Sequence, residues 1–138
     1  TWENKNMFGK IHHVSYLVED LDAAIRSYVE MCQGEKTGQG HVAGLGEVGF
    51  VQVGDVEVEF IEPEDKSQLK AGSGHVFHHV AYVVDNLNRS VSEMRGRGYE
   101  FVTPEPFTNF MGYRLIYIDP SHTGGTRVHL TEASSLRH

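Results

Sequence analysis

The chain has little of three things, and each shortage excludes a class of protein. Cys32 is the only cysteine among 138 residues, so an intrachain disulfide is impossible and a reducing, cytoplasmic location is expected. No stretch approaches the roughly twenty consecutive apolar residues that cross a bilayer, and no signal-peptide pattern opens the sequence, so we expect no membrane partner. Lysine and arginine number 12 against 19 aspartate and glutamate, a formal net charge of −7. Nucleic acid is not an expected partner either, because phosphate contacts need clustered basic side chains.

Histidine, in contrast, is abundant, and it marks an internal repeat. The twelve-residue segment that starts Ile11-His12-His13-Val14 returns as the segment that starts Phe77-His78-His79-Val80. His13 therefore corresponds to His79, an offset of 79 − 13 = 66 residues. Two copies are too few for a solenoid, so they predict one domain built from two similar modules. If the modules pack about a pseudo-twofold axis, His13 and His79 approach one shared cavity.

Each copy is predicted to fold as β-α-β-β-β, which gives an α+β protein. An alternating strand is followed in each copy by an amphipathic segment and then by short alternating strands. Asp20 and Asn86 are suited to begin the two helices, and Gly98 is suited to end the second. The predicted helices are 21–31 and 87–97, and the later strands are 46–53, 56–61, 100–102, 113–118 and 127–131. Within a single domain over 1–138, we place module 1 at about 9–63, a linker with a short helical turn at about 64–75, and module 2 at about 76–133.

A second matched pair of polar residues lies near the end of each copy. Glu59 stands between Val58 and Phe60, and His129 stands in a similar alternating strand, 129 − 59 = 70 residues later. An isolated strand histidine is usually a packed or solvated residue. Four candidates at repeat-related positions instead favour one mononuclear site for a divalent metal ion, with His13, Glu59, His79 and His129 as ligands. Cobalt, nickel, manganese, zinc and iron all suit imidazole and carboxylate donors.

These motifs resemble those of the vicinal oxygen chelate superfamily, which contains glyoxalases, bleomycin resistance proteins and dioxygenases. The resemblance is carried by His12-His13-Val14, by residues 58–63, by His78-His79-Val80 and by residues 118–125, and the last of these is most similar to the methylmalonyl-CoA epimerases. It implies a glyoxalase-like fold in which two βαβββ modules form a cup-shaped mixed sheet around the metal. It also implies a homodimer and a small-molecule substrate whose two vicinal oxygens the metal holds.

The sequence departs from the epimerases at two positions, which leaves the acid and base of the reaction open. The fourth ligand is His129 where epimerases usually have glutamate, so three imidazoles and one carboxylate leave a divalent site at net +1. The position of the proton-shuttling glutamate falls on Val42. His41 and Glu47 are candidate substitutes for that base, the alternative being that both are solvated loop residues. Tyr113 is a candidate hydrogen-bond donor to an enolate, the alternative being a packed strand tyrosine.

One predicted loop is unusually apolar. Phe107, Phe110 and Met111 could form a lid over an apolar part of the substrate. Alternatively, they could fill the open end of the sheet or be buried at a dimer contact.

The leading hypothesis is a metal-dependent isomerase or epimerase that stabilises an enolate and acts on a carbonyl or carboxylate substrate, with acyl-CoA as one candidate. A dioxygenase or lyase of the same superfamily is the alternative, and a small-molecule-binding resistance protein is the third hypothesis.

Overall fold

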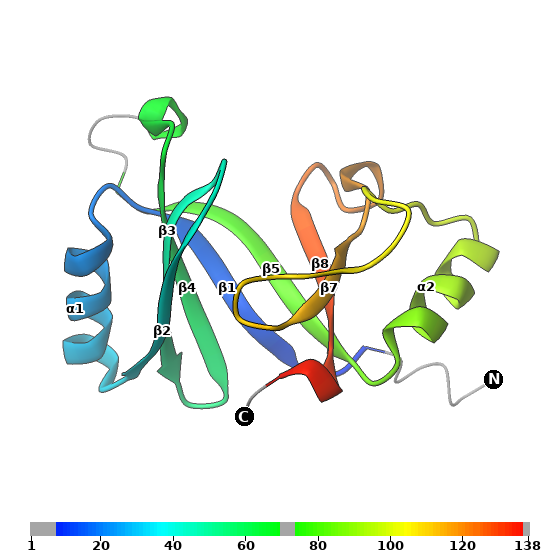
Figure 1. Cartoon of the computed structure of the whole chain (residues 1–138), viewed down its shortest axis with the longest axis horizontal. Coiled ribbons are helices and arrows are strands. Elements are labelled where there is room, and N and C mark those ends of the chain that lie inside the picture. The colour runs from blue at the N-terminus through cyan, green and yellow to red at the C-terminus, as the bar shows by residue number, and fades with distance from the viewer. Residues whose placement is uncertain (1–7, 70–73, 137–138) are drawn as a thin grey trace. The chain divides into compact units, whose positions relative to one another are not determined.

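The structure is a computed structural model that describes residues 8–69 and 74–136 (Figure 1). The described chain divides into two compact units. The first unit is residues 13–78, and the second unit combines residues 8–12 with residues 79–136. Each unit contains one helix and a sheet, so the prediction of an α+β protein with two βαβββ modules is confirmed.

The first unit contains a four-stranded mixed sheet in the order β2-β3-β4-β1. The strand β1 runs parallel to β4, while β3 runs antiparallel to both β2 and β4. The elements are β1 (Ile11–Leu17), α1 (Leu21–Cys32), β2 (Glu35–Val42), β3 (Gly46–Val53), β4 (Val56–Pro63) and a 3-10 turn, η2 (Lys66–Gln68). The short helical turn predicted between the modules is therefore present, at 66–68. The linker residues 70–73 lie outside the described part of the chain.

The first helix begins where two carboxylates satisfy its free backbone donors. The side chain of Asp20 accepts a hydrogen bond from the Ala23 amide at 3.1 Å, and Glu62 Oε1 accepts one from the Leu21 amide at 2.9 Å. The helix ends at Cys32, and the next residue, Gln33, caps it with a left-handed φ of 54°. The next residue is Gly34. A Cβ at this position would lie 2.6 Å from Val51 Cγ1, so glycine is needed where the chain runs close to β3.

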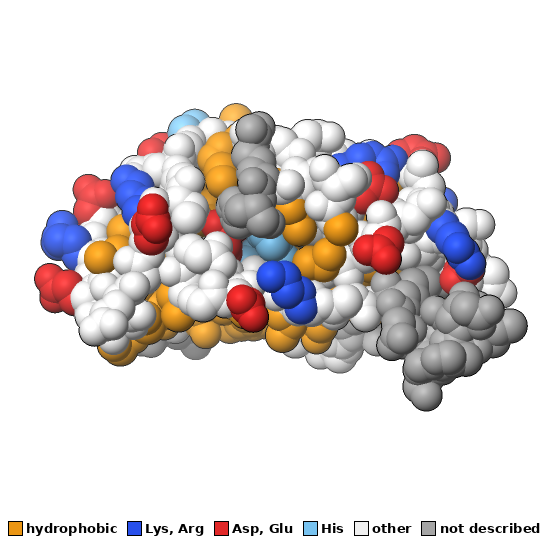
Figure 2. All heavy atoms as spheres, turned by 90° about the horizontal axis from the view of Figure 1, so that it is seen from below, with side chains coloured by type: hydrophobic (Ala, Val, Ile, Leu, Met, Phe, Trp, Pro, Cys, Tyr) orange, Lys and Arg blue, Asp and Glu red, His pale blue; other side chains and the backbone are white. Residues whose placement is uncertain are grey.

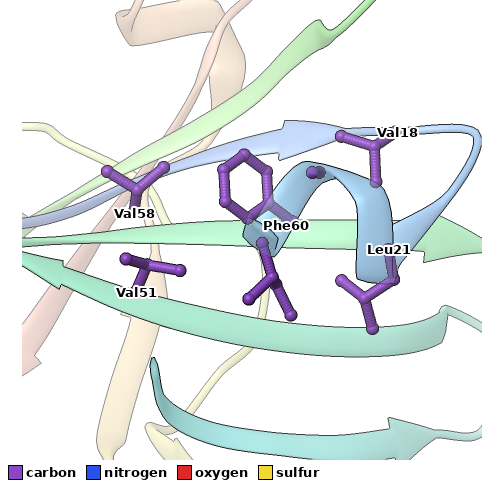
Figure 3. Close-up of a cluster of buried hydrophobic side chains, with 7 residues drawn as sticks. Val18, Leu21, Val51, Val58 and Phe60 are labelled. Carbon is purple, nitrogen blue, oxygen red and sulfur yellow. The ribbon is translucent and has the colours of Figure 1, made fainter. Parts of the chain in front are cut away.

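The core of the first unit lies between α1 and one face of its sheet. Leu21 and Ile25 from the helix pack on Phe60, Val51 and Val58. Figure 3 shows Leu21 together with Phe60, Val51 and Val58. A Cβ at position 49 would lie 2.7 Å from Ile25 Cδ1, so glycine there lets the helix approach β3 closely. The opposite face of this sheet presents the odd-numbered residues of β1 and β4.

The second unit repeats this arrangement with β5-β8-β7-β6 as its strand order. Its elements are β5 (Val76–Val84, from His79 onward in this unit), α2 (Leu87–Gly96), β6 (Phe107–Thr108), β7 (Arg114–Tyr117) and β8 (Arg127–Glu132). The segment before β1 also belongs here, because the Gly9 amide donates to the Val83 carbonyl at 2.6 Å and the Val83 amide donates to the Lys10 carbonyl at 2.9 Å.

The second helix repeats the double cap of the first. Asn86 accepts from the Arg89 amide at 3.1 Å, and Glu132 Oε2 accepts from the Leu87 amide at 2.9 Å, as Glu62 does for the first helix. Gly98 has a φ of 93°, which confirms the predicted left-handed end. The apolar side of α2 packs on the sheet in a cluster of buried side chains: Val84, Leu87, Val91, Met94, Ile116, Ile118 and Leu130.

Two strand predictions need correction. The strand β2 was not located from the sequence, because it is a largely exposed edge strand with glycines at 38 and 40 and no apolar alternation. The strand predicted at 100–102 is reduced to a single bridge between Phe101 and Ile118, and β6 is instead the strand that follows α2.

Among the described residues, no helix is long and apolar enough to cross a membrane. On the face seen in Figure 2, basic and acidic side chains are scattered among polar ones. The described residues visible on that face therefore form no continuous basic surface.

Candidate metal centre

The first unit places His13 and Glu59 together on the sheet face opposite α1. In the parallel ladder, His13 lies beside Glu57 and Ser15 lies beside Glu59, so these four side chains share one face. Nε2 of His13 is 3.8 Å from Oε1 of Glu59, and both side chains are buried. The ring of Phe50, which is paired with Glu59, packs edge-on against the His13 ring at 5.7 Å between centroids. An imidazole and a carboxylate are thus held together against an aromatic wall.

The buried position of Glu59 makes it a demanding group to ionise. Burial raises the pKa of this carboxyl, and the neighbouring His13, Ser15 and His78 act in the opposite direction. A buried carboxylate is stabilised by a positive charge close to it. The site therefore has the electrostatic character that binding of a cation would satisfy.

The second unit places His79 and His129 together in the equivalent way. His129 lies beside Ala81 in the parallel ladder and is paired with Tyr117 in the antiparallel ladder. The ring centroids of His79 and His129 are 4.9 Å apart, and both residues are buried. The Tyr117 ring contacts both imidazoles edge-on, at 5.8 Å from His79 and 4.9 Å from His129.

The two ladders match residue for residue around these pairs. Ser15 beside Glu59 corresponds to Ala81 beside His129, and Phe50 corresponds to Tyr117. The structure therefore brings together the sequence-predicted residues as two equivalent buried pairs, one in each unit.

The base candidates His41 and Glu47 lie on the other face of the first sheet. Gly40 of β2 is paired with Val48, and the ladder continues with Phe50 beside Glu59, so the β2 residues on the Glu59 face are Gly38, Gly40 and Val42. His41 is paired with Glu47 and faces away from Glu59. The alternative that His41 is a solvated loop residue is wrong about the loop, because the exposed His41 belongs to β2. The structure does not bring these two residues to the candidate ligand.

His41 is instead part of an exposed cluster with two glutamates. Its Nδ1 is 2.5 Å from Glu47 Oε2, and its Nε2 is 3.0 Å from Glu64 Oε2. The hydrogen bond to Glu47 raises the pKa of His41, and the negative charges of Glu47 and Glu64 act in the same direction. These contacts favour the imidazolium form of His41.

This cluster predicts a pH dependence with a definite sign. Because the folded pKa of His41 is raised, its contribution to stability is complete below the unfolded value of about 6.5 and is lost as the pH rises through the folded pKa. We expect an NMR titration of the His41 imidazole to have a midpoint above about 6.5. Glu47→Gln should lower that midpoint, whereas Glu105→Gln in an exposed loop should not. A wild-type midpoint at or below the ordinary value would contradict this assignment.

A buried carboxylate that the sequence analysis missed lies on the Glu59 face. Glu57 is almost fully buried, and its Oε2 accepts a hydrogen bond from Thr37 Oγ1 at 2.5 Å. Strand alternation was the signal that could have found it, since residues two apart on a strand share a face.

The remaining candidates take three different positions in the second unit. Tyr113 is fully buried, and its ring packs edge-on against His12 at 5.1 Å, which is the packed arrangement considered as its alternative. Phe107 and Phe110 are exposed, and Met111 is half-buried beside a turn in which Asn109 Oδ1 accepts from the Met111 and Tyr113 amides. A lid formed by Phe107, Phe110 and Met111 stays a prediction.

Comparison with known proteins places this chain in a family. Residues 12–117 match the family model of the Glyoxalase/Bleomycin resistance protein/Dioxygenase superfamily, and the chain belongs to that superfamily. Mitochondrial methylmalonyl-CoA epimerase from Bos taurus is 28% identical over 134 residues, covering 91% of this chain and 75% of the relative. The Homo sapiens enzyme is 25% identical over 131 residues, covering 91% and 74%.

Solved structures confirm the glyoxalase-like fold. The methylmalonyl-CoA epimerase from Mycobacterium tuberculosis superposes with a TM-score of 0.81 at 21% identity, covering 91% of this chain and 89% of that one. A variant of the Streptomyces coelicolor methylmalonyl-CoA epimerase, in complex with 2-nitronate-propionyl-CoA, gives a TM-score of 0.77 at 20% identity, covering 91% and 99%.

Proposed function

We propose that the protein is a divalent-metal-dependent isomerase of the epimerase type that acts on an acyl-CoA. One ion would be held by His13 and Glu59 from the first unit and by His79 and His129 from the second. The observation that carries the proposal is the recurrence of one buried ligand pair at the same ladder positions in both units. Chance packing of histidines gives no reason for such a recurrence.

The donor set fits a divalent transition metal. Each of the three buried histidines offers one imidazole nitrogen, and Glu59 adds one carboxylate, which is a mixed nitrogen and oxygen set of the kind that zinc, cobalt, nickel, manganese and iron accept. Burial raises the pKa of Glu59, and a cation at this carboxylate would offset that cost.

When bound, such an ion supplies a Lewis acid that polarises a carbonyl group and stabilises negative charge on its oxygen. The residues of this chain hold the ligands for that purpose. Phe50 packs on His13, and Tyr117 packs on His79 and His129, so an aromatic ring lies against each of these buried imidazoles. His41 takes no part in proton transfer in this proposal, because it lies on the face away from Glu59.

The acyl-CoA assignment rests on the relatives. Methylmalonyl-CoA epimerases are similar to this chain over 91% of its length, and one of the similar structures holds a propionyl-CoA derivative. A thioester has the carbonyl oxygen that a Lewis acid can polarise, and methylmalonyl-CoA adds a carboxylate oxygen nearby. These two oxygens match the vicinal arrangement that the superfamily resemblance implies.

The test begins with the metal and continues with the reaction. The protein is purified without chelators, and each metal is measured per chain. Methylmalonyl-CoA in D₂O is then followed by NMR for exchange of its α-proton. We expect exchange with the metal-loaded protein and its loss after chelation. Loaded protein that catalyses no exchange would contradict the epimerase proposal.

The donor set also favours a second candidate function. Because His129 stands in place of a carboxylate, three histidines and one glutamate form a set that is also found in oxygen-using iron enzymes of the cupin type. About one equivalent of iron, together with substrate-dependent oxygen consumption, would favour a dioxygenase over an epimerase.

A further inference from the structure

A buried hydroxyl in the second unit lies directly against a candidate metal ligand. Oγ1 of Thr131 is 3.0 Å from Nδ1 of His129, and both side chains are buried. The two residues are separated by one position on β8, so their side chains project from the same face of the sheet. The contact is made by Nδ1 of His129, and Nε2 is the other nitrogen of the ring.

The repeat provides an internal comparison for this contact. Val83 lies beside Thr131 in the second unit, as Leu17 lies beside Ile61 in the first, so Ile61 is the equivalent of Thr131. Ile61 is as fully buried as Thr131. The candidate ligand that precedes Ile61 by two positions is Glu59, a carboxylate. The chain thus has a hydroxyl at this position where the ligand is an imidazole and an alkyl group where it is a carboxylate.

The chemistry of the two ligands explains why only one of them gains from a hydroxyl. A neutral imidazole carries its proton on one nitrogen, and only the other nitrogen has a lone pair for a metal. A hydrogen-bond partner at Nδ1 therefore decides whether Nε2 can be a ligand. If Nδ1–H donates a hydrogen bond to the hydroxyl, the ring's lone pair is on Nε2; if the hydroxyl donates to Nδ1, Nε2 carries the proton and has no lone pair for a metal. A carboxylate has no such choice of tautomer.

We propose that Thr131 is a positioning residue that selects the metal-binding tautomer of His129. Its Oγ1 accepts a hydrogen bond from the Nδ1 proton and leaves the Nε2 lone pair for the ion. The metal-binding half of this inference rests on the proposed function, whereas the tautomer can be measured in metal-free protein.

The first experiment measures the tautomer directly. ¹⁵N NMR of metal-free protein, at a pH where the imidazole is neutral, distinguishes a protonated from an unprotonated Nδ1 in His129. We expect the Nδ1-protonated form in the wild type and in Thr131→Ser, and a shift toward the Nε2-protonated form in Thr131→Val. Because valine has nearly the size and shape of threonine, the variant removes the hydroxyl while filling the same space. An Nε2-protonated His129 in the wild type would overturn the proposal.

The second experiment measures the consequence for metal affinity. Titration with cobalt(II), followed by its visible spectrum, should show a loss of about 10–100-fold in affinity for Thr131→Val, the usual effect of removing an outer partner of a ligand. Thr131→Ser should restore most of that loss, and Ile61→Val, the matched change in the first unit, should leave the affinity unchanged. Equal cobalt affinity for wild type and Thr131→Val would overturn the positioning role. Failure of the wild type to bind cobalt would overturn the proposed metal site, and the NMR result would still decide the tautomer.

Discussion

Replacing His129 with alanine is expected to remove metal binding and, with it, the metal-dependent exchange of the substrate proton. The proposed site loses one of its imidazole ligands, and His79 loses the buried ring that lies 4.9 Å from its own. Removing an outer partner of a ligand costs about 10–100-fold in affinity, so removing the ligand itself should cost more than about 100-fold. The metal content of purified protein and the cobalt titration measure this effect.

The matched control for this variant is His41→Ala. His41 is also a strand histidine, but it lies on the face away from Glu59 and contacts Glu47 and Glu64. We expect His41→Ala to keep the full metal content and the full exchange rate. If His129→Ala retained wild-type metal occupancy, His129 would not be a ligand. If His41→Ala lost the exchange while keeping its metal, His41 would take part in proton transfer, contrary to the proposal.

Phe60→Ala is expected to lower the free energy of unfolding by about 3–5 kcal/mol, the usual cost of removing a fully buried phenylalanine side chain. The Phe60 ring is completely buried between α1 and the sheet (Figure 3). Tyr28 packs on it at 4.9 Å between ring centroids. Since a whole domain is stable by only about 5–15 kcal/mol, this one change should remove a large part of the total. Urea denaturation followed by circular dichroism measures it.

Phe77→Ala is the control for this loss, because the Phe77 side chain is 46% exposed and the same number of atoms is removed from a surface position. We expect Phe77→Ala to cost much less than Phe60→Ala. A loss below about 1 kcal/mol for Phe60→Ala would mean that the core relaxes around the missing ring and is not packed as described.

The strand β4 shows why the stability and the candidate site can be changed separately. Its even-numbered residues Val58 and Phe60 belong to the core beneath α1, and its odd-numbered residues Glu57 and Glu59 lie on the opposite face. Side chains alternate across a strand, so a change at 60 acts first on the packing and a change at 59 first on the ligand set.

Much of the fold could be predicted from the sequence because its signals are local. Asp20 and Asn86 mark the starts of both helices through their side-chain caps, and Gly98 marks the end of one through its backbone conformation. The matching of His13 with His79, and of Glu59 with His129, followed from the repeat and from strand alternation. Each depended only on spacing along the chain, which a sequence contains in full.

The features that the sequence did not reveal depend on pairing and burial rather than on local signals. β2 was not located because its polar residues and glycines give no hydrophobic alternation, and it exists as a strand because β3 pairs with it along its length. His41 was placed in a loop for the same reason, and its register opposite Glu47 turned it away from Glu59. Glu57 looked like one acidic residue among many, and it is the fold that buries it against Thr37.

The sequence by itself determined that this chain has two related modules, that each begins with a strand histidine, and that each ends with a second candidate ligand. Repetition and spacing survive in a linear string, so these conclusions needed no coordinates. Only the tertiary structure decided which face of the sheet each side chain occupies, that burial raises the pKa of Glu59 and a hydrogen bond to Glu47 raises that of His41, and that a threonine hydroxyl lies against His129. Those properties depend on strand register and burial, which arise when segments distant in the chain pair with one another.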